Sequence, residues 1–477
     1  MDASSIPQPT ATLSVTTASP PNSMSGKIGR YRWKICALLF FATTINYIDR
    51  QVLALLKPVL QDPVSGIGLT EVNYGYIVTA FSLAYALGLL VVGGFIDRVG
   101  TKIGYAVAIA VWGLAAASHS LVSFPSVVAL LNGAIHFLSG ALGWKGLMAV
   151  PGAVAGFAVA RFVLGLGESG NFPACIKTVA EWFPQKERAL STGIFNSGAN
   201  VAALIAPLAV PWIAIHLGWR WGFLFTGIFS ATWIVFWWRI YRHPLAHARV
   251  SPAELSYINS DPSESATESQ TKISWVYLFS KRQAWAIFLG KILTDPVWWF
   301  YLYWLPGFLN RRYGLPIGRI GLPLVVIYNM SAIGSIYGGW LPGKFLSLGW
   351  SANRARKTAM LIYAMAVVPV IFVGRMQGVW SVVALLGLAT AAHQAWSANM
   401  FTLASDMFPR RAVASVVGLG TSGAAFLMAF ISTLVGYVLK WTNGNYAPLF
   451  VVCGTGYLTA LLIIQLLAPN LKRVELH

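Results

Sequence analysis

The chain has 477 residues, of which 56% are hydrophobic and only 10% are charged. A soluble globular domain carries roughly 25% charged residues, so this composition excludes a soluble fold. The formal net charge is +19, from 34 Lys and Arg against 15 Asp and Glu. In a membrane protein such an excess collects in cytoplasmic loops, so it predicts no nucleic-acid partner.

The N-terminal segment, residues 1–33, is rich in Ser, Thr and Pro over most of its length. It has no basic region leading into a short apolar stretch and a small-residue cleavage site, so we expect no cleaved signal peptide. We predict a disordered cytoplasmic tail.

Twelve later stretches are long enough for transmembrane helices, which need about 20 predominantly apolar residues. They are 34–57, 74–96, 103–122, 150–175, 190–215, 219–241, 284–309, 321–346, 358–376, 380–404, 413–439 and 447–468. A thirteenth candidate, 124–148, is apolar but interrupted by residues such as Asn132, His136 and Lys145.

The distribution of Lys and Arg decides between twelve and thirteen spans. With twelve spans and a cytoplasmic N-terminus, most basic residues outside the membrane lie on the cytoplasmic side. A thirteenth span would place more of them outside than inside, which the positive-inside rule disfavours. We therefore expect 124–148 to be a re-entrant or surface-lying periplasmic insertion, and both termini to be cytoplasmic.

Residues 242–283 interrupt the apolar pattern with Pro, Glu, Asp, Ser and Thr, and predict a polar cytoplasmic linker. The linker separates an N-terminal six-helix bundle, 34–241, from a C-terminal six-helix bundle, 284–468. A short cytoplasmic tail, 469–477, follows the second bundle.

The two bundles are related in sequence. Phe183-Pro184, Gly193 and Ser197-Gly198-Ala199 recur 225 residues later as Phe408-Pro409, Gly418 and Ser422-Gly423-Ala424. The sequence therefore predicts an all-α membrane protein of 12 transmembrane helices in two pseudo-symmetric six-helix bundles. Transporters that rock two bundles around a midplane site have this architecture.

The sequence gives no sign of an enzyme. Cys36, Cys175 and Cys453 lie in apolar stretches without disulfide or metal-ligand spacing, and we interpret them as packing residues. No nucleotide loop, metal cluster or pair of nucleophile and base is evident. We expect no enzymatic activity, no cofactor and no metal.

Six ionisable residues fall within the predicted spans. Each such charge costs roughly 2.5–3.5 kcal/mol at the bilayer centre on insertion scales, so these residues are functional candidates. Three are acidic and three are basic, which predicts pairing around a shared cavity. They are Asp49, Arg50, Arg161, Glu168, Lys291 and Asp295.

Spans one and four carry four of these charges. In span one, Asn46 lies one turn before Asp49 and Arg50. In span four, Arg161, Glu168 and Asn171 are spaced to share one helical face, as a water-filled cavity requires. Static ion pairs that hold the two helices together are the alternative interpretation.

Span seven contains Lys291, Asp295 and Pro296, followed by a run of aromatic residues. Pro296 predicts a broken helix that faces a cavity, since freed backbone groups at membrane depth need one. The alternative for Lys291 is an extended side chain that reaches the cytoplasmic interface. The aromatic residues fit either a sugar site or an outer aromatic belt.

Span ten carries His393, Gln394, Trp396 and Asn399 in an apolar stretch. By the repeat offset, His393 corresponds to Glu168, which favours a position at the cavity over that of a buried structural histidine. Tyr85 in span two and Thr421 in span eleven are further polar candidates.

Several motifs resemble a known family. The segment GGFIDRVGTK from Gly93 resembles the loop-two signature of the major facilitator superfamily. NYIDRQVL from Asn46, ARFVLGLGESGNFPA from Ala160 and AEWFPQKERA from Ala180 resemble its anion:cation symporter branch. KILTDPVWWFYLYWLP from Lys291 and HQAWSANMFTLASDMFP from His393 resemble its bacterial hexuronate transporters. The resemblance covers the chain from residue 31, and 124–148 is its departure.

The resemblance implies roles for the polar residues. Asp49 and Glu168 match the protonatable carboxylates, and Arg50 and Arg161 match the residues that handle the substrate carboxylate. The predicted substrate-binding set is completed by Tyr47, Tyr85, Asn171, Lys291, His393, Trp396 and Thr421. Asp97 and Arg98 are the predicted gating residues, and Asp295, Gln394 and Asn399 are secondary candidates.

The sequence and the resemblance together predict a secondary transporter of the bacterial inner membrane. We expect a monomer that imports a hexuronate, such as glucuronate or galacturonate, with protons. In the predicted mechanism Asp49 holds Arg50 and Glu168 restrains Arg161 or its surroundings, until protonation frees both arginines for the anion. The alternatives are symport or exchange of another organic anion, such as an aldonate, tartrate or an aromatic acid, and a sugar-acid sensor without transport.

Overall fold

A computed structural model describes residues 28–143, 150–260, 275–408 and 410–474. These residues form helices, turns and loops, and none of them forms a β-strand. The predicted all-α fold is confirmed. Most of the predicted N-terminal tail lies outside the described residues, as do parts of the predicted insertion, linker and C-terminal tail.

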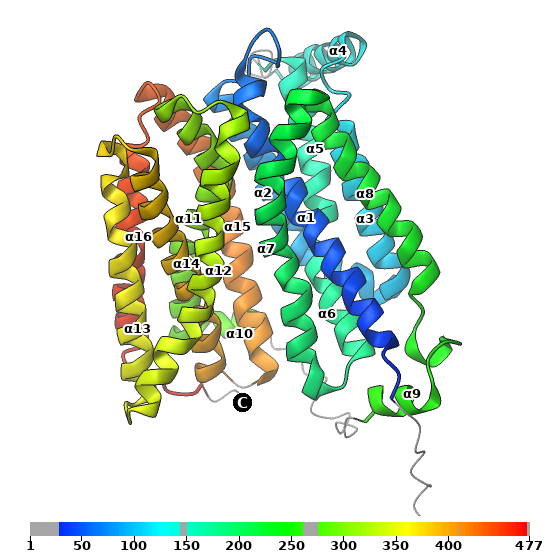
Figure 1. The fold of residues 1–477 in the computed structure, drawn as a ribbon, viewed down its shortest axis with the longest axis vertical. Helices are drawn as coiled ribbons and strands as arrows, with labels where there is room; N and C mark the ends of the chain where they lie inside the picture. The colour runs from blue at the N-terminus through cyan, green and yellow to red at the C-terminus, as the bar shows by residue number, and fades with distance from the viewer. Residues whose placement is uncertain (1–27, 144–149, 261–274, 409, 475–477) are drawn as a thin grey trace, which may run out of the picture.

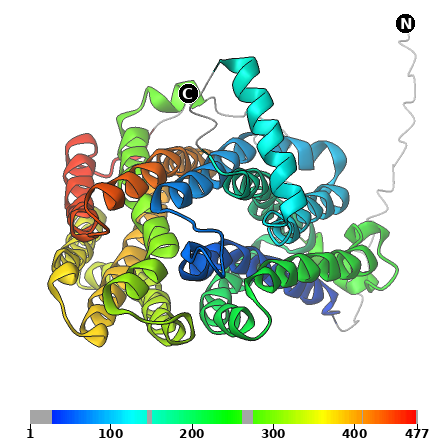
Figure 2. The same cartoon turned by 90° about the horizontal axis from the view of Figure 1, so that it is seen from above.

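The helices form two groups that lie side by side (Figures 1 and 2). The first group, the N-half, comprises α1 (Tyr31–Gln61), α2 (Glu71–Val99), α3 (Thr101–Ser118), α5 (Gly152–Glu168), α6 (Asn171–Trp182), α7 (Gln185–His216) and α8 (Trp219–Ile240). The second group, the C-half, comprises α11 (Arg282–Tyr313), α12 (Ile317–Ser347), α13 (Ala352–Val367), η3 (Val368–Arg375), α14 (Val379–Met407), α15 (Arg410–Trp441) and α16 (Ala447–Leu467). The pairs α5–α6 and α13–η3 each form one span, which gives six spans in each half of the described chain.

Ten spans of the described chain are long and apolar enough to cross a membrane. The other two of the twelve predicted spans lie in α1 and α11, which have 31 and 32 residues. At about 1.5 Å per residue these helices are longer than a hydrocarbon core of about 30 Å. Their low hydropathy follows from the charges that they carry, including Asp49 and Arg50 in α1 and Lys291 and Asp295 in α11.

The position of the helix break differs from the predicted one. The prediction that Pro296 breaks span seven is wrong, because α11 is continuous through Pro296 and Pro306. Span four is the one interrupted at Ser169 and Gly170, between α5 and α6. There the Gly170 N–H donates to the Gly167 carbonyl, three residues back, at 3.1 Å.

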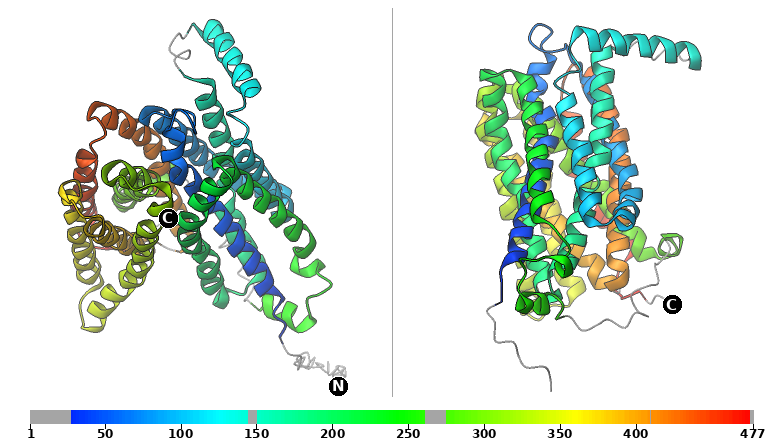
Figure 3. Two further views of the ribbon diagram at one scale, coloured as in Figure 1. Left: turned by 45° about the horizontal axis from the view of Figure 1, so that its top comes forward. Right: turned by 90° about the vertical axis from the view of Figure 1, so that its right-hand side faces the viewer.

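Residues 125–142 form a helix, α4 (Pro125–Leu142), that lies across the ends of the spans (Figure 3). It follows α3 and precedes α5, so both of its connections are at the same end of the molecule. We call this the far end, and the opposite end, where α1 begins, the N-terminal end.

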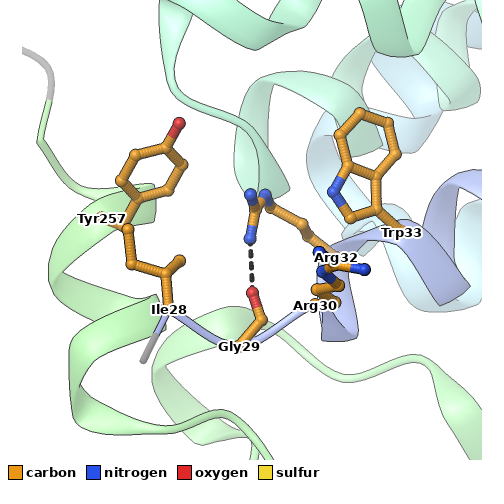
Figure 4. Close-up of a pocket in the computed structure, with 6 residues that line it drawn as sticks. All are labelled: Ile28, Gly29, Arg30, Arg32, Trp33 and Tyr257. Carbon is orange, nitrogen blue, oxygen red and sulfur yellow. Dashed lines mark hydrogen bonds between the residues drawn. The ribbon is translucent and has the colours of Figure 1, made fainter. Parts of the chain in front are cut away.

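The linker contains η2 (Pro244–Ala246), α9 (Pro252–Ile258) and α10 (Trp275–Phe279). Helix α9 is attached to the start of α1, because Glu254 accepts a hydrogen bond from the Arg32 backbone N–H at 3.1 Å and pairs with its guanidinium at 3.3 Å. Beside this contact lies a pocket of about 530 Å³ (Figure 4). Its residues are Ile28, Gly29, Arg30, Arg32, Trp33 and Tyr257.

The two halves meet closely at the far end. The Tyr74 hydroxyl donates to the Tyr303 carbonyl at 2.6 Å, and the Tyr76 and Tyr437 hydroxyls lie 2.7 Å apart. Backbones also approach there, since a Cβ added to Gly75 of α2 would lie 2.6 Å from the Ser432 carbonyl of α15. These contacts close the space between the halves at this end.

At the N-terminal end, several glycines have open space beside them. A Cβ added to Gly94 of α2, Gly193 of α7, Gly343 of α12 or Gly418 of α15 would have no atom of another element within 4 Å. The helices are therefore loosely packed around these glycines.

Candidate functional site

Arg50 and Glu168 form a buried ion pair between α1 and α5. Arg50 Nε lies 2.6 Å from Glu168 Oε2, and the two side chains are 6% and 0% exposed. The predicted pairing of Arg50 with Asp49 is wrong. Adjacent helical residues project about 100° apart, so Arg50 reaches α5 while Asp49 lies on a different face of α1.

Within the described residues, Arg161 forms no direct ion pair with Glu168, whose carboxylate pairs with Arg50 instead. Its Nη1 donates to the backbone carbonyl of Asp49 at 3.3 Å, and the side chain is almost fully buried. A backbone carbonyl leaves the positive charge of the guanidinium without a bonded counter-ion. Arg161 is therefore positioned by α1 but not neutralised by a direct ion pair.

Buried polar atoms without a hydrogen-bond partner among the described residues gather around these two arginines. Most buried polar groups in proteins are hydrogen-bonded, so such a concentration needs an explanation. The atoms are Asn46 Nδ2 and Oδ1, Asp49 Oδ2, Arg50 Nη2, Arg161 Nε and Nη2, and Glu168 Oε1. We call the five residues that carry these atoms the N-half polar cluster.

Aromatic rings surround the Arg50 guanidinium. Its carbon lies 4.6 Å from the centroid of the Tyr85 ring and 5.1 Å from that of Tyr47. Cation–π contacts of this kind stabilise a desolvated cation. The predicted site residues Tyr47 and Tyr85 are thus brought together with Arg50.

Tyr303 of α11 extends the site into the C-half, and the sequence analysis did not select it. Its ring packs edge-on against Phe81, with centroids 6.4 Å apart, and the Phe81 centroid lies 5.6 Å from the guanidinium carbon of Arg50. The only feature of the sequence that could have identified Tyr303 is its position in the aromatic run of span seven. There, sequence alone does not distinguish a residue of the membrane aromatic belt from a residue of the substrate site.

Lys291 and Asp295 form an ion pair one turn apart within α11, with Nζ and Oδ2 at 2.7 Å. Lys291 is 3% exposed, so its side chain does not reach an interface, and that alternative is wrong. The side chain packs on α15, where a Cβ added to Gly420 would lie 2.8 Å from its Cδ. Thr421 follows on α15, and its hydroxyl donates within the helix to the Val417 carbonyl at 3.0 Å.

His393 of α14 lies between two rings. Its imidazole stacks on Trp298 of α11 with centroids 5.3 Å apart and planes 6° apart, and its Nδ1 lies 2.6 Å from the Tyr457 hydroxyl. Trp396 is fully buried against Tyr457, and its indole N–H has no partner among the described residues. Trp299 meets Tyr85 across the two halves at 6.0 Å.

Two of the predicted residues form hydrogen bonds between helices, and a third is partly exposed. The Asn171 amide oxygen accepts from the Tyr105 hydroxyl of α3 at 2.6 Å and its amide nitrogen donates to the Thr43 hydroxyl of α1 at 3.5 Å, so Asn171 bridges these two helices. Asn399 donates to the Gly338 carbonyl of α12 at 2.7 Å. Gln394 is partly exposed on α14.

The predicted gating residues lie at the N-terminal end, in the last turns of α2. Asp97 forms an ion pair with Lys177 of α6 at 2.8 Å, which is a contact within the N-half. Arg98 is exposed. The structure does not bring either residue to the polar cluster.

A second buried charge network, which the sequence analysis missed, joins the halves at the far end. Lys57 Nζ lies 2.6 Å from Glu71 Oε2 and 4.2 Å from the ring centroid of Trp304 in α11. Arg311 of α11 approaches Glu71 at 3.5 Å. Lys57 is the last residue of the predicted span one, and a lysine at the end of a span is commonly exposed to solvent. We call Lys57, Glu71, Trp304 and Arg311 the far-end clasp.

No group of three His, Cys, Asp or Glu within the described ranges could hold a metal ion. The three cysteines are buried and unpaired.

Comparison with known proteins identifies the family. A model described as Major Facilitator Superfamily matches residues 39–433. The "Hexuronate transporter" of Escherichia coli (strain K12) is 30% identical over 451 residues, which cover 94% of this chain and 96% of that relative. The "Galacturonate transporter" of Dickeya chrysanthemi is 31% identical over 67% of this chain and 84% of the relative.

Solved structures show the same fold at low sequence identity. The D-xylose-proton symporter superposes with a TM-score of 0.68 at 14% identity, covering 94% of this chain and 100% of that chain. A bacterial homologue of the human lysosomal transporter Spinster, in an inward-facing conformation, gives 0.64 at 16% identity over 93% and 96% of the two chains. The chain therefore belongs to the Major Facilitator Superfamily and is a multi-pass membrane protein of that transporter family.

Proposed function

We propose that the protein imports a sugar-acid anion, a hexuronate such as glucuronate or galacturonate, by proton symport through alternating access. The observation that carries the proposal is the N-half polar cluster. Two buried guanidinium groups with unpartnered N–H donors lie there beside two buried carboxylates. The names of the relatives support a sugar acid as the substrate.

The arginines would bind the substrate carboxylate. A guanidinium is planar, keeps its charge and can hold a carboxylate through two parallel hydrogen bonds. Three guanidinium nitrogens have no hydrogen-bond partner among the described residues, namely Arg50 Nη2, Arg161 Nε and Arg161 Nη2. Their N–H groups can therefore donate to a substrate while the hydrogen bonds described above stay intact. A monoanion bound between them would satisfy several of these groups at once.

Glu168 and Asp49 would carry the protons. Arg50 is held by ionised Glu168 at 2.6 Å, and protonation of this carboxylate would weaken its hold on the guanidinium. Asp49 lies on the same stretch of α1 whose backbone positions Arg161, so it is the second protonation site. In this revised mechanism the pairs differ from those predicted, but the coupling principle is the same.

Two protons also suit the energetics of uptake. Importing one anion against an inside-negative potential of 100 mV costs about 2.3 kcal/mol. One proton cancels that cost, and a second makes uptake electrogenic and favourable. Two protonatable carboxylates in the cluster match this stoichiometry.

The C-half would recognise the sugar ring. Trp298 and Trp299 lie half-buried on α11 and could pack against its C–H face, with His393 behind Trp298 and Tyr303 beside Phe81. Lys291, Trp396 and Thr421 complete the substrate-binding set on this side, and Asp295 positions Lys291.

We place the protein in the bacterial inner membrane as a monomer, with both termini and the linker in the cytoplasm and α4 on the periplasmic side. The far-end clasp would then be the periplasmic gate. Asp97 and Arg98 would act at the cytoplasmic gate when the N-terminal ends of the halves approach each other.

Uptake by proteoliposomes tests the proposal. With an inward pH gradient, radiolabelled glucuronate or galacturonate should accumulate, and a protonophore should abolish accumulation. The Asp49→Asn variant should still bind substrate but should not accumulate it. No acceleration by the gradient, together with wild-type behaviour of Asp49→Asn, would contradict proton coupling. Tight binding without flux would favour a sensor.

A second candidate substrate class is favoured by other relatives. The "D-galactonate transporter" of Escherichia coli O6:H1 is 26% identical over 94% of this chain, and a "Probable galactarate/D-glucarate transporter GudP" of Bacillus subtilis is 28% identical over 95%. A competition panel of hexuronates, aldonates, aldarates and aromatic acids in the same assay would separate these classes. Stronger inhibition by an aldonate than by glucuronate would replace the hexuronate assignment.

A further inference from the structure

Helix α4 takes no part in the proposed transport mechanism, although it is one of the most apolar exposed elements of the described chain. Its eighteen residues contain no Asp, Glu, Lys or Arg. Leu130 and Phe137 are 73% and 75% exposed, and Leu138 is 46% exposed. In water, each such side chain forgoes about 1.5–3 kcal/mol of burial.

The start of α4 is held at the level where the neighbouring spans end. After α3, the Leu121 N–H donates to the Ser118 carbonyl at 2.9 Å, and the Phe124 N–H donates to the Leu121 carbonyl at 3.0 Å. Arg220, at the start of α8, donates to the Ser123 hydroxyl at 2.9 Å. Because α3 and α8 cross the bilayer, these contacts place α4 at its edge.

The middle of α4 packs on the beginning of α5. A Cβ added to Gly152 would lie 2.5 Å from Asn132 Oδ1, and one added to Gly156 would lie 2.8 Å from Leu131 Cδ1. Beyond this contact α4 runs across the ends of the spans and projects past the bundle (Figures 2 and 3). The ten residues after Asn132 extend about 15 Å.

The side chains of α4 divide into three faces. Leu130, Ala134, Phe137 and Ala141 are exposed and follow one another at intervals of four, three and four residues, so they form one apolar face. Ile135 and Ser139 are buried on a second face. The polar residues Asn132 and His136 are exposed on a third.

We propose that α4 is an interfacial helix that inserts the face formed by Leu130, Ala134, Phe137 and Ala141 into the membrane leaflet at the far end. The partner is the acyl-chain region of phospholipid. The spans that adjoin α4 also expose large apolar side chains, since Leu114 of α3 and Val159 of α5 are 73% and 61% exposed. Since α4 carries no Lys or Arg, its attachment depends on apolar burial and not on anionic headgroups.

Site-specific fluorescence in liposomes tests this proposal independently of the transported substrate. Phe137→Cys and His136→Cys are labelled with an environment-sensitive nitrobenzoxadiazole probe in the full chain, and Val64→Cys serves as the water control, since Val64 is 92% exposed in the α1–α2 loop. The native cysteines are buried, which directs the label to the new residue. None of the three replaced side chains lies in the core, so the variants should fold.

We expect the Phe137→Cys probe to have blue-shifted emission and to be quenched by spin-labelled acyl chains, at a depth of about 5–10 Å. The probe at His136→Cys should be quenched more by aqueous iodide, as at Val64→Cys. Equal iodide quenching at all three positions would overturn the proposal. So would protection of the Phe137→Cys probe from both quenchers, which would indicate a protein contact such as a second copy. A requirement for anionic lipid would contradict apolar attachment.

Discussion

Arg50 in the N-half and Lys291 in the C-half are both buried cations within membrane spans, yet their partners differ. Arg50 reaches from α1 to Glu168 on α5, whereas Lys291 pairs with Asp295 one turn along the same helix. The first pair depends on how two helices are placed. The second is complete within α11 and would survive a movement of that helix.

The same contrast extends to the surrounding groups. In the N-half polar cluster, all five buried side chains have unpartnered atoms, and these include both arginines and both carboxylates. In the C-half, His393 and Lys291 have bonded partners and aromatic neighbours. The N-half is therefore suited to exchange partners during the cycle, and the C-half is suited to present a fixed surface to the substrate.

Arg161→Gln tests the N-half side of this contrast and should have the largest effect. Truncating a charged hydrogen-bonding group in a buried complex costs about 2–5 kcal/mol, so glucuronate affinity should fall by one to several orders of magnitude. Binding and uptake by the purified protein measure this. Arg319→Gln, an exposed arginine at the start of α12, is the control. Equal affinity in both variants would remove Arg161 from the site.

Glu168→Gln should separate binding from coupling. The neutral amide mimics the protonated carboxylate, so substrate exchange across the membrane should persist while accumulation driven by a pH gradient is lost. Wild-type uptake should increase as external pH falls, and uptake by the variant should depend little on pH. Glu254→Gln, which alters a buried carboxylate in the linker contact, is the matched control. Retention of gradient-driven accumulation by Glu168→Gln would count against a coupling role.

The Lys291–Asp295 pair should behave as one unit. Lys291→Gln leaves Asp295 without its cation, and we expect uptake to fall about tenfold, less than the 3–5 kcal/mol of a fully buried pair because Asp295 is 18% exposed. The double variant Lys291→Gln/Asp295→Asn should recover part of this loss. Thermal unfolding of the wild type, Lys291→Gln, Asp295→Asn and the double variant distinguishes stability from transport. Additive losses in the double variant would show that the two residues act separately.

Trp298→Leu should give the smallest effect. Aromatic stacking contributes about 0.5–1.5 kcal/mol beyond the area that it buries, so removing the ring should raise the KM for uptake a few-fold and leave proton coupling unchanged. Trp380→Leu, a tryptophan that is 57% exposed at the start of α14, is the comparison. A loss of coupling in Trp298→Leu would contradict the division of roles between the halves.

The fold and the intramembrane charges were predictable because burial of an unneeded charge in a membrane is costly. Asp49, Arg50, Arg161 and Glu168 were identified as neighbours for this reason, and the structure brings them together. Their pairing was not predictable, because it depends on the rotation of α1 relative to α5. Sequence spacing describes neighbours within one helix only.

Other errors have equally local causes. The placement of Asn171 on the face of Glu168 requires a continuous helix, but Ser169 and Gly170 interrupt the helix, and the Tyr105 hydroxyl donates to the Asn171 amide oxygen. Tyr303 was missed because an aromatic run in a span predicts a membrane belt as readily as a site. Lys57 was missed because its partners Glu71 and Trp304 come from other helices.

Lys57 of the far-end clasp also has a kinetic consequence. Its ammonium is fully buried, 4.5 Å from the Tyr74 ring and 4.2 Å from the Trp304 ring, which belong to different halves. Parting the halves at this end must remove one ring from the cation and admit water to a group that now has none of its surface exposed. In the proposed alternating-access cycle that step would recur in every turnover whichever anion is carried, so the speed of the returning empty carrier would be set at a lysine remote from the substrate.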